Sequence, residues 1–405
     1  MLLLLVSFSM TAQAHLPEYF GRKFVLLGPT PPATTGCTDD RAALREQAAR
    51  LQQGLDRAQL ETGAYNPSLA DPLGELAKVY VSLCNHPASL DTYRKALQIV
   101  RVNDGLLHPA QIPYLKALAD SYEAIGDFAS AQQSLRSVFR IHDLGQGELN
   151  DAALRDSLAY FARALEIFID PRASGDMYLF FEAFNDNERM LEMQLERADL
   201  DYPAREALAI SHLQNMYLLL GTDFVTMSGI SGDATSPAVN FMQRSQMLTY
   251  GKGGKLLEAL IDVAATESPV TRAQLYFRLG NWQQWNAKWG QACDSYTRAW
   301  DLADGAGGQA LRTQLSRPAE LPEDAALWTS LLDPGIAENA TITASFRVSA
   351  RGDISRVDAR AEGDASSGLA GRLARWLRDS HARPAIVNGA CADGELQGRR
   401  YRLLD

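Results

Sequence analysis

Residue types that take part in catalysis elsewhere are present in this sequence, but without the spacing that catalysis requires. The six histidines are scattered, and none belongs to an H-x-x-x-H metal-binding pair. Residues 251–255 read Gly-Lys-Gly-Gly-Lys, yet Leu256 stands where a phosphate-binding loop has the Ser or Thr that holds magnesium. Residues 229–232, Gly-Ile-Ser-Gly, lack the last glycine of a nucleophile elbow. The sequence therefore predicts no catalytic residue, metal or cofactor, and we interpret residues 251–255 as a turn that joins two helices.

Four cysteines are the remaining candidates for covalent or metal chemistry. They are Cys37, Cys84, Cys293 and Cys391. They form no C-x-x-C pair and lie near no histidine at metal-ligand spacing, so a zinc site is not expected. An even count permits two disulfides in an exported protein, with three possible pairings. Cys37 precedes the first predicted helix and Cys84 closes the second, so in an antiparallel hairpin both sulfurs lie toward the same end. We therefore favour a Cys37–Cys84 disulfide.

The N-terminus has the features of an export signal. Residues 2–10 form a short apolar run, and Ala12 and Ala14 follow the small-residue rule for signal-peptidase cleavage. The run is nine residues long, too short to span a bilayer, and no later stretch has the length of a membrane helix. No Lys or Arg precedes the run, and an apolar helix retained in the fold is the alternative interpretation. We expect residues 1–14 to be a signal peptide and the mature protein to be periplasmic.

Length and composition indicate an ordinary globular protein. The chain of 405 residues is long enough for two or three domains, each with its own core. Its hydrophobic fraction of 46% and charged fraction of 22% are those of a folded protein rather than a disordered one. The formal net charge of -10 argues against nucleic acid as a partner, because nucleic-acid binding requires a clustered basic surface.

One pattern of bulky, small and aromatic residues occurs twice between residues 76 and 139. Five positions of the first copy recur about 42 residues later in the second. They are Leu76, Ala77, Tyr80, Tyr93 and Ala96, then Leu118, Ala119, Tyr122, Leu135 and Val138. Small residues let the two helices of a hairpin approach closely, and Gly126 supplies the turn between them in the second copy. The pattern resembles the tetratricopeptide repeat, in the longer-spaced form found in kinesin light chains.

The same pattern returns near the end of the helical part of the sequence. Leu279-Gly280 is followed by Ala292, Tyr296 and Ala299 at matching offsets. Between the two regions, residues 150–264 carry apolar stripes of helical period that do not align with the repeat. We interpret them as diverged hairpins that continue the same stack. The predicted fold is mostly α, a solenoid of helical-hairpin repeats over residues 37–303, followed by a small α+β C-terminal domain.

The resemblance to tetratricopeptide repeats implies a superhelix whose concave face binds a protein partner, because the first helix of each unit lines the inside. The inner positions read from the repeat register are Lys78, Ser82, Lys116, Asp120, Glu123, Asn281, Gln284 and Trp285. Most of them are polar, and a face that is merely solvated is the alternative explanation. Trp285 differs from the other tryptophans of the last unit, because its position projects toward the concave face.

Beyond residue 336 the periodicity changes from helical to alternating. Residues 342–348 and 354–359 alternate apolar and polar side chains around a turn at 351–353, which predicts a β-hairpin. Residues 369–377 predict a short amphipathic helix, and residues 399–404 predict a last strand. The predicted α+β domain spans 336–405, with a linker at 304–335. Residues 15–36, rich in Pro, Gly and Thr, are predicted to be an extended lead-in.

These C-terminal elements resemble the C-terminal domain of TonB-like energy transducers. The matching features are Phe346-x-Val348, Gly352, Trp376, Arg-Pro-Ala at 383–385 and Gly389, whereas the usual opening Tyr-Pro is absent. The resemblance implies recognition by strand addition, in which a partner segment pairs with an exposed terminal strand. The implied edge residues are Arg399, Arg400, Tyr401 and Arg402. Charged residues on an edge can equally serve to prevent strand addition.

The predicted function is that of an exported scaffold, not an enzyme, which binds one or more protein partners through its helical repeats. One alternative is an accessory component of TonB-type energy-dependent outer-membrane transport, which would meet a periplasmic or outer-membrane protein through the C-terminal module. A second alternative is a hydrolase whose site converges from the irregular middle helices.

Overall fold

The computed structural model describes residues 24–26, 41–145, 149–169, 177–195, 201–221, 237–322, 341–361, 367–380 and 382–403. The predicted signal peptide at 1–14, Cys37, the Gly-Ile-Ser-Gly sequence and most of the predicted lead-in lie outside these residues. Within them, every helix is too short or too polar to cross a membrane.

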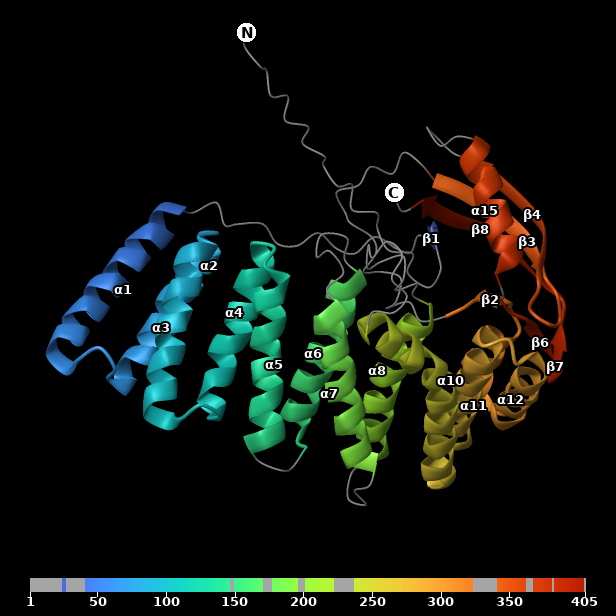
Figure 1. Ribbon diagram of the computed structural model, residues 1–405, viewed down its shortest axis with the longest axis horizontal. Helices are drawn as coiled ribbons and strands as arrows, with labels where there is room; N and C mark the ends of the chain where they lie inside the picture. The colour runs from blue at the N-terminus through green and yellow to red at the C-terminus, as the bar shows by residue number, and fades with distance from the viewer. Residues whose placement is uncertain are drawn as a thin grey trace, which may run out of the picture.

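Paired helices form most of the molecule and lie side by side in an arc, with a small sheet at its C-terminal end (Figure 1). A long helix, α1 (Arg41–Thr62), stands at the N-terminal end of the arc. The hairpins that follow are α2 (Ala70–Ser82) with α3 (His86–Asp104), α4 (Ile112–Ala124) with α5 (Phe128–Gly145), α6 (Asp151–Ile169) with α7 (Met177–Leu195), α8 (Tyr202–Gly221) with α10 (Pro237–Val263), and α11 (Pro269–Trp285) with α12 (Trp289–Leu302). The predicted fold class is confirmed, and the middle helices continue the stack.

Small residues at the predicted repeat positions let the helices approach closely. Ala77 and Ala96 of the first hairpin are completely buried, and Leu76 fills the adjacent core. Gly126 lies in the turn between α4 and α5 with a φ of 79°, a left-handed conformation that favours glycine. In the last hairpin, a Cβ at residue 280 would overlap the ring of Tyr296, so only glycine permits this approach of α11 to α12. The pattern read from the sequence therefore marks real helix contacts.

The Gly-Lys-Gly-Gly-Lys sequence lies inside α10, so its predicted role as a turn between helices is wrong. A Cβ at Gly253 would overlap the indole ring of Trp282, which is completely buried. The Trp282 Nε1 donates a hydrogen bond of 3.1 Å to the carbonyl oxygen of Tyr250. Glycine is present here because α11 places a tryptophan directly against the backbone of α10.

The C-terminal module contains a four-stranded antiparallel sheet with the order β1-β8-β3-β4. Its strands are β1 (Phe24–Leu26), β3 (Thr341–Val348), β4 (Ile354–Ala361) and β8 (Gly394–Leu403). Ile342, Phe346 and Val348 are buried on one face of β3 and share a core with Leu373 and Leu377 of α15 (Ser367–Asp379). The hairpin and amphipathic helix predicted from residues 342–377 are thus present.

The terminal strand β8 is not a free edge of this sheet. It pairs with β3 on one side, and over its last residues it pairs with β1 on the other. Val25 lies opposite Arg402, and Leu26 lies opposite Tyr401. The predicted edge strand is therefore covered where the N-terminal segment adds to the sheet, and β4 lies at the opposite edge.

The segment that joins the repeats to the module is structured in its described part. Residues 304–322, predicted as a linker, contain α13 (Gln309–Leu315) and β2 (Ala319–Glu320). Strand β2 pairs with β5 (Ala382–Arg383), and β6 (Ala385–Val387) pairs with β7 (Ala390–Ala392). The module therefore packs against the end of the repeat stack and is not connected to it by an unstructured linker in the described residues.

A disulfide joins Cys293 of α12 to Cys391 of β7, with their Cα atoms 5.9 Å apart. It ties the last hairpin to the C-terminal module across 98 residues of sequence. This pair leaves Cys37 and Cys84 for each other, which is the pairing favoured from the sequence. Because Cys37 lies outside the described residues, that disulfide stays a prediction.

Candidate partner-binding groove

The predicted concave positions of the first two hairpins lie on the exposed face of α2 and α4. Lys78 and Ser82 are exposed, and Lys78 forms an ion pair of 2.7 Å with Glu75 of the same helix. Lys116 of α4 reaches Asp156 of α6 at 2.5 Å, and Glu123 reaches Arg163 at 2.5 Å. Lys116 and Glu123 thus connect neighbouring inner helices, which leaves them less available to a partner than the sequence suggests.

The electrostatics of these pairs follow from their partial burial. Asp156 accepts hydrogen bonds from Lys116 and from the Nε2 of His142, which lies 3.0 Å away. Burial opposes its charged form, but these two donors outweigh burial and lower the pKa of Asp156. For Glu123 the balance is reversed, because desolvation raises its pKa in spite of the nearby Arg163. Asp120 is exposed beside them and faces the same surface.

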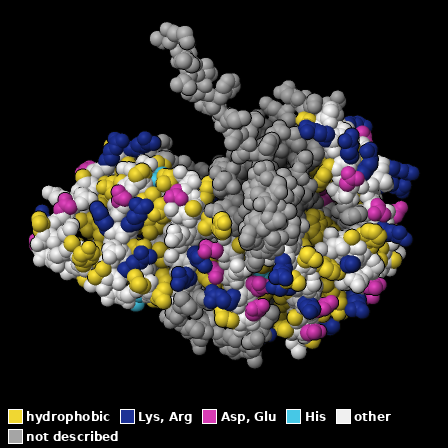
Figure 2. All heavy atoms as spheres, in the orientation of Figure 1, with side chains coloured by type: hydrophobic (Ala, Val, Ile, Leu, Met, Phe, Trp, Pro, Cys, Tyr) yellow, Lys and Arg dark blue, Asp and Glu magenta, His cyan; other side chains and the backbone are white. Residues whose placement is uncertain are grey.

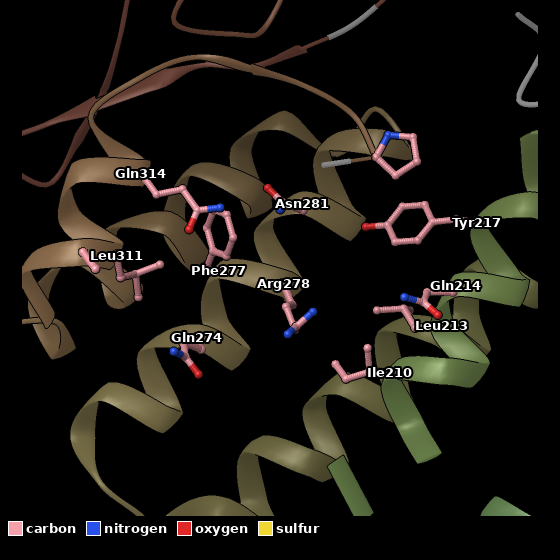
Figure 3. A pocket seen from close by; sticks show the side chains of 12 residues that line it. Ile210, Leu213, Gln214, Tyr217, Gln274, Phe277, Arg278, Asn281, Leu311 and Gln314 are labelled. Carbon is pink, nitrogen blue, oxygen red and sulfur yellow. The ribbon is translucent and has the colours of Figure 1, made fainter. Parts of the chain in front are cut away.

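A cavity of about 550 Å³ lies on the concave side between α8, α11 and α13 (Figure 3). A second cavity, of about 470 Å³, lies between α6 and α8 and shares Ile210, Gln214 and Arg278 with the first. The two therefore form one continuous depression across three hairpins, which we call the Arg278 groove. Figure 3 shows Arg278 pointing from α11 into the space that faces α8.

The side chains of the Arg278 groove offer a mixture of charge, amides and rings. Arg278 is partly buried, and it makes no ion pair with any residue in the described part of the chain. The carboxamides that line the groove are Gln214, Gln274, Asn281 and Gln314, and its aromatic residues are Tyr217 and Phe277. Leu213 and Leu311 add apolar surface on opposite walls. A cation among amides and rings can bind a carboxylate and the polar main chain of an extended segment.

Of the predicted concave residues in the last hairpin, only Asn281 lines this groove. Asn281 is 7% exposed, and its Oδ1 accepts a hydrogen bond of 3.0 Å from the hydroxyl of Tyr296. Gln284 is 1% exposed, and its Nε2 donates to the carbonyl oxygens of Arg351 and Ala382 at 2.9 and 3.0 Å. The chain's own C-terminal module therefore covers the Gln284 position. Trp285 is half-buried and packs edge-to-face on Tyr217, with ring centroids 6.0 Å apart.

The residues predicted for strand addition are mostly engaged within the module. Tyr401 is completely buried in the module core. The Nε of Arg399 lies 3.0 Å from the buried carboxylate of Glu320. Arg402 pairs through its backbone with Val25 and Thr341, and only Arg400 is exposed among those whose side chains are described. These four residues therefore do not form an open docking edge.

Sequence reasoning missed Arg278, Gln214 and Tyr217, which line the groove. The available signal for Arg278 was its position one helical turn before Asn281, on the same face of α11. Gln214 and Tyr217 belong to a helix that does not match the repeat, so no register assigned an inner face to them. In the residues that the structure describes, no group of three His, Cys, Asp or Glu side chains is arranged to hold a metal ion.

Comparison with known proteins supports the repeat assignment. Residues 68–143 match a sequence model of the tetratricopeptide repeat family, so the first two hairpins are tetratricopeptide repeats. A solved kinesin light chain from Podosopora anserina, described as having nearly identical TPR-like repeats, is 16% identical, with 52% of this chain and 88% of that chain covered and a TM-score of 0.34. BtubC (BKLC) from P. vanneervenii is 14% identical, with 67% and 92% covered and a TM-score of 0.29. Curated protein sequences give no match. The TonB-like resemblance of the C-terminal module stays a prediction.

Proposed function

We propose that this chain is an exported scaffold that binds an extended segment of a protein partner in the Arg278 groove. A tetratricopeptide repeat scaffold supports a role in protein–protein interaction, because stacked hairpins present long concave surfaces of this kind. The apolar run at residues 2–10 and the following Ala-x-Ala sequence support export to the periplasm. The proposal assigns no chemical step to the chain.

The observation that carries the proposal is the environment of Arg278. Its side chain is partly buried in the groove and forms no ion pair among the described residues, although Glu206 of α8 lines the second cavity with it. Elsewhere on the inner face the cations Lys116 and Arg163 are matched by carboxylates. A partly desolvated Arg binds a carboxylate more strongly than a surface cation does, because less water competes for it. The expected partner segment therefore places an Asp or Glu against Arg278.

The amides on either side of Arg278 suit the main chain of such a segment. Each carboxamide offers both a donor and an acceptor, so the exposed Gln274 can bond to a peptide group of any sequence. Tyr217, Phe277 and Leu311 supply apolar and aromatic contacts for neighbouring side chains. Affinity would come from the main chain and selectivity from the acidic and apolar positions.

The test uses a photo-crosslinking amino acid at Gln274, an exposed residue of the groove. The full-length protein is exposed to periplasmic extract, and crosslinked proteins are quantified by mass spectrometry. We expect Arg278→Glu to reduce crosslinking at least tenfold, because it reverses the charge of the side chain that points from α11 toward α8 (Figure 3). The matched control is Arg375→Glu, an exposed residue of α15 on the module, whose surface carries many basic side chains (Figure 2). Equal crosslinking in the two variants would count against the groove as the binding site.

A further inference from the structure

One wall of the Arg278 groove does not come from the repeats. Leu311 and Gln314 of α13 line the cavity opposite α8, and Pro322 also lines it. Helix α13 is seven residues long, and so short a helix is marginal in water without support from its surroundings. The shape of this wall therefore depends on whatever holds α13 in place.

Arg383 of the C-terminal module supplies much of that support. Its side chain is 1% exposed, and its two terminal nitrogens donate to the carbonyl oxygens of Leu315 and Gln314 at 3.3 and 3.1 Å. These carbonyls end α13, where a cation is favoured because the last carbonyls of a helix carry partial negative charge. The guanidinium also lies over the ring of Phe277, with its Cζ 5.2 Å from the centroid. Phe277 lines the groove, so one side chain supports two of its surfaces from behind.

The rest of the wall is held from the same side. Ala319 and Glu320 of β2 pair with Arg383 and Ala382 of β5, which places Pro322 at the rim of the groove. Ile386 of β6 is completely buried in one cluster with Leu311 and Leu315. Residues more than 60 positions apart in the sequence thus form a single layer behind the groove.

We propose that Arg383 is a positioning residue of the Arg278 groove, and that the docked C-terminal module builds the wall on which partner binding depends. This inference rests on the proposed function of the groove. The module then serves as an integral part of the binding surface and not as a separate docking domain. Loss of the Arg383 contacts frees α13 and widens the groove, while the repeats remain folded around their own cores.

The first measurement is amide hydrogen exchange on the full-length, disulfide-bonded protein. In Arg383→Met, a variant of similar length without the donors, we expect exchange of residues 309–322 to be at least tenfold faster. Exchange in the first two hairpins, residues 68–143, should not change, because the core cluster of α2 to α4 shares no residue with the cluster that contains Leu311 and Leu315 of α13. Arg375→Met is the matched control, since Arg375 is exposed on α15. Uniform acceleration across the chain, or no change in 309–322, would overturn the proposal.

The second measurement is binding of 8-anilinonaphthalene-1-sulfonate, an aromatic anion suited to a groove with one cation and two rings. We expect Arg383→Met to weaken its binding at least fivefold and Arg375→Met to leave it unchanged. Unaltered affinity together with fast exchange of residues 309–322 would show that α13 does not shape the groove.

A second variant, Arg383→Lys, is used if Arg383→Met is insoluble. It keeps the charge but cannot donate to two carbonyls in the same planar geometry. It is expected to give at least threefold faster exchange in 309–322, and normal exchange refutes the proposal.

These outcomes are distinguishable from failure of the proposed function. Unchanged crosslinking in Arg278→Glu removes the groove as a partner site, whatever Arg383 does. Reduced crosslinking in Arg278→Glu but full crosslinking in Arg383→Met removes only the positioning role.

Discussion

The indole ring of Trp282 lies directly over Gly253, so that α10 and α11 meet where one helix has no side chain. A Cβ at residue 253 would overlap the nearest atoms of the ring, whereas a Cβ at Gly254 would meet no atom within 4 Å. Both glycines lie inside the same helix, and their neighbours in sequence are lysines. Packing against Trp282 therefore accounts for Gly253 but not for Gly254.

This pair of glycines allows a controlled test. We expect Gly253→Ala to lower the free energy of unfolding by about 1–3 kcal/mol, because an overpacked core must shift the indole or the helix. Gly254→Ala should raise it by about 0.5–1 kcal/mol, since alanine favours a helix more than glycine does. Urea denaturation followed by circular dichroism measures both. Equal effects of the two substitutions would contradict the contact with Trp282.

Stability should fall in mild acid because of His212. This side chain is 1% exposed and packs against the tilted ring of Phe184, with ring centroids 4.8 Å apart. Burial, aided by the charge of Lys252, lowers its pKa to about 3. The unfolded chain takes up a proton on this histidine below about pH 6.5, whereas the folded chain does so only near pH 3. The histidine therefore destabilises the fold progressively as the pH falls through this window.

The expected loss from His212 between pH 7 and pH 5 is about 2 kcal/mol, from the ordinary histidine pKa and about 1.4 kcal/mol per pH unit. Replacing it by leucine should remove this part of the pH dependence. Comparing unfolding free energies of the two proteins at both pH values cancels the contributions of other groups. Parallel pH profiles would show that His212 accepts a proton in the folded state.

Asp156 should matter more to stability than either of its partners. It is 12% exposed and joins Lys116 of α4 to His142 of α5. We expect Asp156→Asn to cost about 1–2 kcal/mol, because hydrogen bonds to a charged acceptor are among the stronger ones. Lys116→Met should cost less than about 1 kcal/mol, since that side chain is half-exposed and its pairing is screened by solvent.

The pH range of the effect at Asp156 separates it from the effect of His212, although both lower stability as the pH falls. Its pKa is lowered in the folded state, so its contribution is present above the unfolded carboxyl pKa and is lost as the pH falls toward the folded value. The difference between wild type and Asp156→Asn should therefore shrink only below about pH 4. A difference that shrinks already at pH 6 would contradict the assignment of this pH dependence to Asp156.

Removing the Cys293–Cys391 disulfide should loosen the C-terminal module before the repeats. The bond closes a loop of 98 residues, for which a loss of about 2–4 kcal/mol is typical. We expect the double variant Cys293→Ser/Cys391→Ser to show an earlier thermal transition in the module, measured by hydrogen exchange of β6 and β7. Exchange in α2 to α5 should be the same as in the wild type. Simultaneous loss of both regions would mean that the module and the repeats unfold as one unit.

The sequence predicted what depends on local spacing. Leu76, Ala77 and Tyr80 recur at a fixed interval because each hairpin repeats the same contacts, and the alternation at residues 342–348 records one buried face of a strand. The sequence did not predict the features that depend on contacts between segments far apart in the chain. Gln284 appeared to be an inner-face residue, but the turn at Arg351 and the strand at Ala382 cover it. The sequence did not identify Arg278, because the cavity that it lines is formed with α8 and α13. The repeat register of α11 does not predict where these two helices lie.

The pairing of β1 with β8 places residues near both ends of the chain on adjacent strands. Residues 24–26 are synthesised well before their partners at 401–403. Hairpins can stack one after another as the chain emerges, because their contacts are local. The sheet cannot be completed until residues 401–403 have been synthesised, so β1 lacks its partner while the segment between the two strands is made. A variant that lacks residues 401–403 would leave β1 without its partner strand, so exposure of β1 reports whether β8 has formed.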